Sequence, residues 1–262
     1  MKNIGKLIEE QADFCSGLKR IAQLFAEDID SKFDVTSILL TGSAARGDAR
    51  MGKLGVLVDL TIISDTGNLN LQDSYGPDRE PFIPYYCTRF MNTGFQIKQE
   101  TLSHIFDTNK SESECFALSE SLVLTTKYPE MDSIIRQLYP KSQGSRKDTA
   151  MKNYRRYFYL CGEYRYEKWE YREAYHQMAQ NFHEAFECFC GFVYAVNGSF
   201  IPRKDWLAYL LPEQEIKPPN IELLINKMLR VLPERNGIEE GKIIYQTVGK
   251  WMKTTAENFG WI

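Results

Sequence analysis

A glycine-serine turn and a later carboxylate are the residues of this sequence best suited to chemistry. Gly42 and Ser43 follow an apolar, β-branched run, and Asp59 lies within a second such run. A strand that ends in Gly-Ser can turn sharply and bring backbone N–H groups against an anion, because glycine has no side chain to block the approach. The Ser43 hydroxyl adds another donor. The pattern predicts a phosphate-binding turn.

Asp59 is the predicted metal ligand. Its neighbours Val58 and Leu60 are apolar, and a charge inside such a strand costs free energy unless it is paired or bound to a metal. A carboxylate on a neighbouring strand can hold Mg²⁺ against phosphates that the turn binds. We therefore expect one Mg²⁺ and a nucleotide at this point of the fold.

The segment 39–63 resembles the nucleotidyltransferase superfamily related to polymerase beta, which includes aminoglycoside, lincosamide and minimal nucleotidyltransferases. The family pattern is an apolar strand, Gly-Ser, often Arg-Gly, and then two carboxylates separated by one apolar residue. Gly42, Ser43, Arg46 and Asp59 match it. The resemblance implies Mg²⁺-dependent transfer of a nucleoside monophosphate from ATP or another nucleoside triphosphate to a hydroxyl of a small molecule.

The resemblance also implies roles for individual residues. Gly42 and Ser43 would hold the phosphates, and Asp59 would hold the metal. Arg46 would either bind a phosphate or pair with a neighbouring acid or the second domain. Family members carry a further carboxylate on a later strand as the base for the acceptor hydroxyl, and the corresponding strand here offers only Glu100, at its end.

One member of the expected carboxylate pair is missing. The first carboxylate of the family pattern falls on Leu57, and if Asp59 is taken as the first, the second falls on Thr61. Asp48 or Asp65 could substitute, although nothing in the spacing requires it. Two-metal phosphoryl transfer needs several carboxylates. A second interpretation therefore stays open: a catalytically degenerate nucleotide-binding or protein-interaction module on the same fold.

The composition is that of an ordinary globular protein. The chain has 262 residues, of which 43% are hydrophobic and 26% are charged. Its apolar runs are too short to span a bilayer, and its N-terminus lacks an apolar signal segment. The six cysteines are scattered without a Cys-x-x-Cys pair, which favours reduced thiols over a structural zinc site. We expect a cytoplasmic protein with no membrane partner.

Charge divides the chain into two halves. Residues 1–140 hold 14 Lys and Arg against 20 Asp and Glu, whereas residues 141–262 hold 18 against 15. The basic and aromatic run 152–175 is typical of a helix that packs its aromatic residues, although base stacking is an alternative. A helix facing a cleft could place Lys152, Arg155 or Arg156 against a triphosphate. The acidic pI of about 5.8 disfavours a nucleic-acid partner.

Hydrophobic periodicity predicts the order of elements. Helices and strands alternate through the first half, and strand patterns stop after it. The fold class expected is α+β: a small mixed sheet with flanking helices over residues 1–140, followed by an all-α helical bundle over 141–262. The predicted elements are a helix over the first thirty residues, strands at 35–41 and 55–63, a strand pair at 84–90 and 95–98, a linker at 140–150 and a long helix at 151–170.

Overall fold

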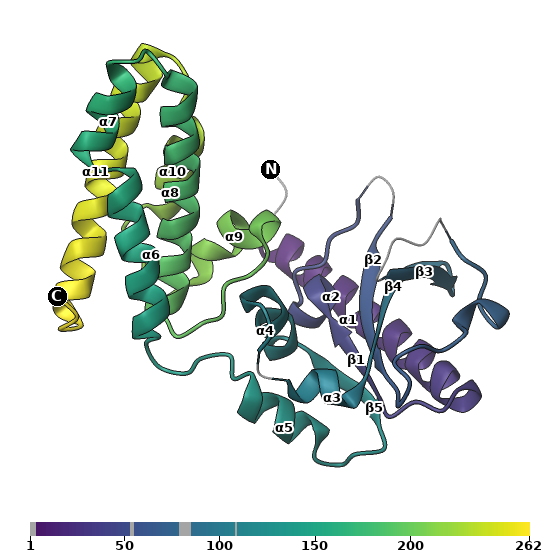
Figure 1. Ribbon diagram of the computed structural model, residues 1–262. Helices are drawn as coiled ribbons and strands as arrows, with labels where there is room; N and C mark the ends of the chain where they lie inside the picture. Colours follow the sequence, from purple (N-terminus) through teal and green to yellow (C-terminus); the bar gives the residue numbers. More distant parts are fainter. Residues whose placement is uncertain (1–3, 53–54, 79–84, 108) are drawn as a thin grey trace. The chain divides into compact units, whose positions relative to one another are not determined.

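The computed structural model describes residues 4–52, 55–78, 85–107 and 109–262 (Figure 1). The chain forms two compact units, Met1–Pro140 and Lys141–Ile262. The expected fold class is confirmed: a five-stranded mixed sheet with flanking helices, followed by a helical region. Within the described ranges, no helix is long and apolar enough to cross a membrane.

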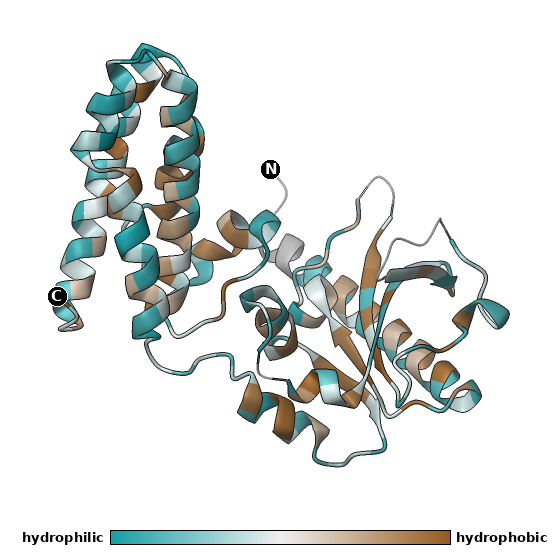
Figure 2. Cartoon of the chain, in the orientation of Figure 1, coloured by the Kyte–Doolittle hydropathy of each residue, from teal (hydrophilic) through white to brown (hydrophobic). Residues whose placement is uncertain are grey.

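The sheet of the first unit has the strand order β3-β4-β2-β1-β5, in which β2 and β4 are parallel and all other neighbours are antiparallel. Figure 2 shows β1 and β2 as strongly apolar strands, as expected for the buried centre of a sheet. The strands are β1 (Ser37–Thr41), β2 (Leu57–Ile63), β3 (Tyr85–Phe90), β4 (Thr93–Glu100) and β5 (Leu122–Thr126).

A tight turn joins β3 to β4, as the sequence pattern indicates. Met91 and Asn92 both have positive φ, +46° and +64°, and two such residues in succession suit the right-handed twist of a hairpin. The turn is shorter than the predicted span of 91–94, because Thr93 and Gly94 already pair in β4. Pro84, the predicted start of the first strand, lies outside the described residues.

The helix α1 (Ile4–Lys32) covers one face of the sheet. Apolar residues recur along it at helical spacing, and Leu18, Ala22, Phe25 and Ile29 are buried. The ring of Phe25 lies 4.6 Å from that of Phe95 in β4. Val58 belongs to the same core cluster. Because side chains alternate along a strand, Leu57 and Asp59 must face the opposite side of the sheet from α1.

Short helices accompany the other elements of this unit. They are α2 (Gly42–Arg46), the 3₁₀ turn η1 (Leu71–Asp73), α3 (Leu102–Phe106), α4 (Glu112–Ser119) and α5 (Met131–Leu138). The Tyr139 hydroxyl donates to the carbonyl oxygens of Ile105 at 2.7 Å and Asp107 at 2.9 Å. This buried tyrosine therefore fixes the end of α5 against α3.

The second unit is built from helices with an aromatic core. The Tyr157 hydroxyl donates to the Tyr245 carbonyl at 2.6 Å, and the ring of Phe182 lies 4.5 Å from that of Tyr245. All three side chains are almost fully buried. The helices are α6 (Lys147–Leu160), α7 (Glu163–Glu170), α8 (Tyr175–Val196), α9 (Lys204–Leu210), the 3₁₀ turn η2 (Leu211–Glu213), α10 (Ile221–Leu229) and α11 (Arg235–Asn258).

Two predicted boundaries in this unit are wrong. The linker expected at 140–150 ends early, because α6 begins at Lys147. The long helix expected at 151–170 is interrupted at Cys161 and Gly162, where Gly162 takes an extended conformation and begins α7. Glycine is a poor helix former, and an added Cβ at Gly162 would lie 3.1 Å from the Phe158 carbonyl oxygen. The break is therefore encoded locally, by one glycine within a strong apolar period.

Candidate functional site

The glycine-serine turn sits where β1 ends. Gly42 begins α2 with φ of +66°, and Gly47 ends it with φ of +94°. The Gly47 N–H donates to the Ser43 carbonyl at 3.0 Å. From α1, the Cys15 thiol donates to the Gly47 carbonyl at 3.1 Å. The end of the turn at Gly47 is thus held by a backbone bond and by the helix that covers the sheet.

Asp59 lies directly against Gly42. Thr41 is the register partner of Asp59 in the β1–β2 ladder, so the next residue, Gly42, turns away beside the carboxylate. A Cβ added to Gly42 would overlap Asp59 Oδ2 and lie 3.0 Å from Asp59 Cγ. The carboxylate therefore occupies the space that a side chain at position 42 would need. The structure brings these two predicted site residues together.

Ser43 completes this corner of the site. Its side chain is partly exposed, and its hydroxyl makes no hydrogen bond to any other residue in the described part of the chain. A hydroxyl in that condition can donate to an anion from outside the protein. The corner thus combines the glycine backbone, the Ser43 hydroxyl and the carboxylate of Asp59, which the β1–β2 pairing brings beside Gly42.

Arg46 is engaged within its own unit. Its Nε lies 3.2 Å from Asp48 Oδ1, and its guanidinium carbon lies 5.9 Å from the centre of the Phe116 ring. The side chain of Arg46 is only 12% exposed. Of the roles expected for Arg46, the geometry favours pairing with a neighbouring acid over binding a phosphate. The same ion pair engages the carboxylate of Asp48.

The register of β2 decides which carboxylate is missing. Leu57 and Asp59 share one face, and the Leu57 side chain lies across Gly94 of β4, with its Cδ1 3.2 Å from where a Cβ at Gly94 would be. Thr61 pairs with Leu39, and both are buried. A second carboxylate near the turn would therefore stand at position 57, where this chain has leucine.

Glu100 does not lie beside Asp59, contrary to the expectation for a base. Gln96 is the β4 residue level with Asp59, whereas Glu100 is level with Ile63. Four residues of strand separate Gln96 from Glu100, about 13 Å at the usual rise per residue. Asp65 follows Ile63 and lies beyond the same far end of β2. The structure therefore places an amide, not a carboxylate, next to Asp59 on β4.

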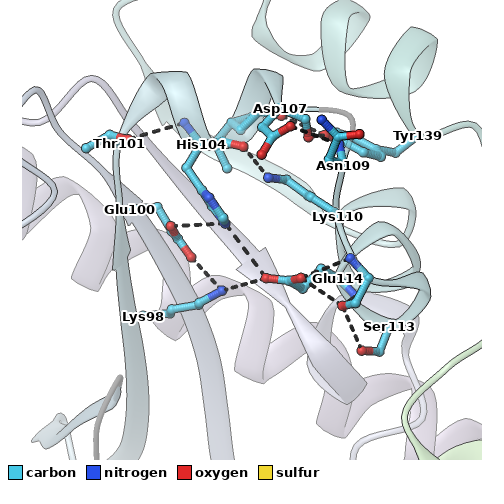
Figure 3. Close-up of polar contacts among 12 residues, drawn as sticks. Lys98, Glu100, Thr101, His104, Asp107, Asn109, Lys110, Ser113, Glu114 and Tyr139 are labelled. Atoms are coloured by element: carbon cyan, nitrogen blue, oxygen red, sulfur yellow. Dashed lines mark hydrogen bonds and ion pairs between the residues drawn. The ribbon is translucent and has the colours of Figure 1, made fainter.

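Glu100 belongs instead to a separate ionic cluster (Figure 3). Lys98 Nζ lies 2.5 Å from Glu100 Oε1 and 3.5 Å from Glu114 Oε1. His104 Nε2 lies 3.4 Å from Glu100 Oε2 and 3.7 Å from Glu114 Oε1. The cluster joins β4, α3 and α4. Glu100 at the end of β4 and His104 in α3 are only four residues apart in the sequence, but only the packing of α4 brings Glu114 to them.

Glu114 makes this cluster sensitive to acid. A hydrogen bond from the Ser111 hydroxyl, and then one from the Ser111 N–H and the nearby Lys98, hold the pKa of Glu114 below its ordinary value of 4.5. Ser111 and Glu114 form a capping box at the start of α4. Because the folded-state pKa is lowered, the stabilisation is present above the unfolded-state pKa and is lost as the pH falls through the folded-state value.

We expect Glu114→Gln to lower the free energy of unfolding at pH 7 by about 0.5 to 1 kcal/mol, since glutamine keeps the capping geometry but loses the charge. The thermal midpoint would fall by about 1–4 °C. Wild type and variant should converge as the pH falls through the lowered pKa of Glu114, because the carboxyl is then protonated. Thermal unfolding followed by circular dichroism from pH 3 to 7 measures this, and a gap that persists unchanged in acid would show that the charge of Glu114 is not its cause.

Comparison with known proteins assigns no family to the chain. No family model matches the sequence, and no curated protein matches it. Among solved structures, the chain is similar to a nucleotidyltransferase-like protein from Exiguobacterium sibiricum, with 10% sequence identity and a TM-score of 0.44 over 92% of this chain and 78% of that one. The kinship to nucleotidyltransferases therefore remains a resemblance carried by the turn and strand of this site.

Proposed function

We propose that the α+β unit binds a Mg²⁺-nucleoside triphosphate at Gly42, Ser43 and Asp59. It would transfer the nucleoside monophosphate to a hydroxyl of a small molecule and release pyrophosphate. The observation that carries the proposal is the seating of the Asp59 carboxylate against Gly42, where β1 ends. A carboxylate beside a turn that has no side chain is better placed to bind a metal and its phosphates than to stabilise the fold.

The residues present fit one magnesium ion. Mg²⁺ in nucleotide sites is commonly held by one or two carboxylates, with substrate phosphates and water as the remaining ligands. Asp59 supplies one carboxylate, and Gln96 stands level with it on the neighbouring strand. In the ranges that the structure describes, no group of three His, Cys, Asp or Glu side chains is placed to hold a metal by itself. The metal would therefore arrive with the nucleotide, and when bound it would supply positive charge opposite the phosphates.

The chain's own residues then have distinct tasks. Gly42 lets the phosphates approach the backbone, and the Ser43 hydroxyl donates to a phosphate oxygen. Asp59 fixes the orientation of the triphosphate through the metal. Because Leu57 and Gln96, which lie near Asp59 on the same face, are not carboxylates, nothing at those two positions takes the proton of the acceptor hydroxyl. We therefore expect transfer to be slow compared with binding.

Leu57 and Gln96 also favour a second candidate function. Both face the same side of the sheet as Asp59, and neither can hold a second metal as a carboxylate would. A protein with this site could bind a nucleotide and report its presence without turning it over. This is the degenerate nucleotide-binding module that the sequence left open.

Thermal unfolding with ATP, GTP, CTP or UTP, each with and without Mg²⁺, tests both functions. A nucleotide at 100 times its Kd should add about 2.7 kcal/mol to the stability of the folded state, which is a rise of about 5–11 °C in Tm. We expect a Mg²⁺-dependent rise with at least one nucleotide, and slow pyrophosphate release with a hydroxyl acceptor. A rise without pyrophosphate release across an acceptor panel would favour the second function. The lack of any Mg²⁺-dependent rise would contradict both.

A further inference from the structure

A basic hollow lies entirely within the helical unit. Its volume is about 540 Å³, within the range of small-molecule sites in proteins. One wall is the first half of α6, and the other is the segment that follows α11. The lining residues are Lys147, Asp148, Met151, Lys152, Arg155 and Trp261.

The three basic side chains that line the hollow have no carboxylate partner among the described residues. In the described part of the chain, no ion pair or hydrogen bond joins Lys147, Lys152 or Arg155 to a carboxylate. Some other cations of the unit are paired: Arg156 lies 2.5 Å from Glu184, and Lys204 lies 2.8 Å from Glu187.

Helix geometry brings these cations together. Lys147, Met151 and Arg155 follow one another at intervals of four residues along α6, so they lie on one face, and Lys152 adjoins them. Lys152 and Arg155 are three residues apart on the helix surface, so their like charges repel each other. An anion bound between them would relieve that repulsion. Because these cations are not paired with carboxylates, no ion pair has to break for the anion to bind.

The indole of Trp261 is held in place by a helix-ending turn. Gly260 has φ of +65°, and its N–H donates to the Glu257 carbonyl at 2.9 Å. The Trp261 N–H donates back to the Ala256 carbonyl at 3.0 Å. This pair of bonds is the Schellman motif, which requires a residue with positive φ at the position of Gly260. The Trp261 ring also stacks on Phe259 at 4.6 Å.

We propose that this hollow is a second nucleotide site, which binds phosphates between Lys147, Lys152 and Arg155 and stacks the base on Trp261. Asp148 distinguishes a nucleotide from a bare polyanion, because its carboxylate repels phosphate but accepts hydrogen bonds from sugar hydroxyls or base amino groups. The site uses no residue of the α+β unit. It therefore stands independently of the function proposed for Asp59.

Isothermal titration calorimetry of the full chain in EDTA tests the proposal, with ATP and inorganic tripolyphosphate as the two probes. EDTA removes the contribution that depends on Mg²⁺. We expect ATP to bind about tenfold more tightly than tripolyphosphate, since stacking of one base is worth about that factor or more. Trp261→Ala should remove this advantage without weakening tripolyphosphate, whereas Trp261→Phe should keep most of it.

Charge reversal at Lys152 has a matched control. Lys152→Glu should weaken both probes about tenfold or more. Lys250→Glu makes the same change at another exposed lysine of the unit, in α11 and outside the hollow, and should leave both affinities within about twofold. Equal affinities of ATP and tripolyphosphate for wild type would overturn the proposal. So would equal losses in the Lys152 and Lys250 variants, or a loss of both probes in Trp261→Ala.

Asp59→Asn separates this site from the one in the α+β unit. We expect its ATP affinity in EDTA to equal that of wild type, and a loss there would overturn the second site. If the function proposed for Asp59 fails, the Mg²⁺-dependent rise in Tm is absent from wild type while ATP still binds in EDTA. If the second site fails, ATP does not bind in EDTA, whether or not the Mg²⁺-dependent rise in Tm is observed.

Discussion

Asp59→Asn is expected to abolish the Mg²⁺-dependent rise in Tm that a nucleoside triphosphate produces. The amide is close to the carboxylate in size but carries no charge, and Mg²⁺ prefers anionic oxygen ligands. Asp59 supplies the one carboxylate seated against Gly42, so its loss should remove the whole linkage term, about 2.7 kcal/mol at 100 times the Kd. Thermal unfolding with and without Mg²⁺, at fixed nucleotide, measures the effect as a difference within each variant.

Asp65→Asn is the matched control for this change. Asp65 is exposed and lies beyond the opposite end of β2 from the turn. The Asp65→Asn substitution removes one negative charge, as Asp59→Asn does, from a position six residues away in the sequence. We expect this variant to keep the Mg²⁺-dependent rise in Tm. A full rise in the Asp59 variant would show that the metal is held elsewhere, and an equal loss in both variants would point to net charge instead of ligation.

Gly42→Ala should destabilise the folded protein and weaken nucleotide binding together. With φ of +66°, position 42 costs an L-residue about 1–2 kcal/mol. The new methyl group would also overlap Asp59 Oδ2, and the carboxylate would have to move from the turn. We expect a total loss of about 2–4 kcal/mol, measured by urea denaturation, and a Mg²⁺-dependent rise in Tm that is much smaller than that of wild type.

Two further variants isolate the causes. Gly17→Ala places the same methyl in the interior of α1, where nothing lies within 4 Å of the added Cβ, so it should stabilise by about 0.5–1 kcal/mol. The double variant Gly42→Ala with Asp59→Ala removes the overlap and should recover part of the stability lost in Gly42→Ala. If Gly42→Ala is as stable as wild type, the close seating of Asp59 against the turn is wrong.

The elements of this protein follow from local sequence. The helical period of the first thirty residues, the β-branched runs before Thr41 and Ile63 and the turn at Met91 and Asn92 each predict what the structure contains. Local signals suffice there because side-chain periodicity and backbone preference act over a few residues. The long helix expected at 151–170 failed because of a single glycine: Gly162 ends a period that otherwise continues from α6 into α7.

The sequence by itself also determined which residues belong to the candidate site, since Gly42, Ser43 and Asp59 have types suited to phosphate and metal. Only the tertiary structure decided how they combine. The β1–β2 register seats Asp59 against Gly42, and the β2–β4 register puts Gln96 beside it and Glu100 about four residues away. Strand register depends on contacts between segments distant in sequence. For that reason, motif spacing predicted the turn and its carboxylate but misplaced the base.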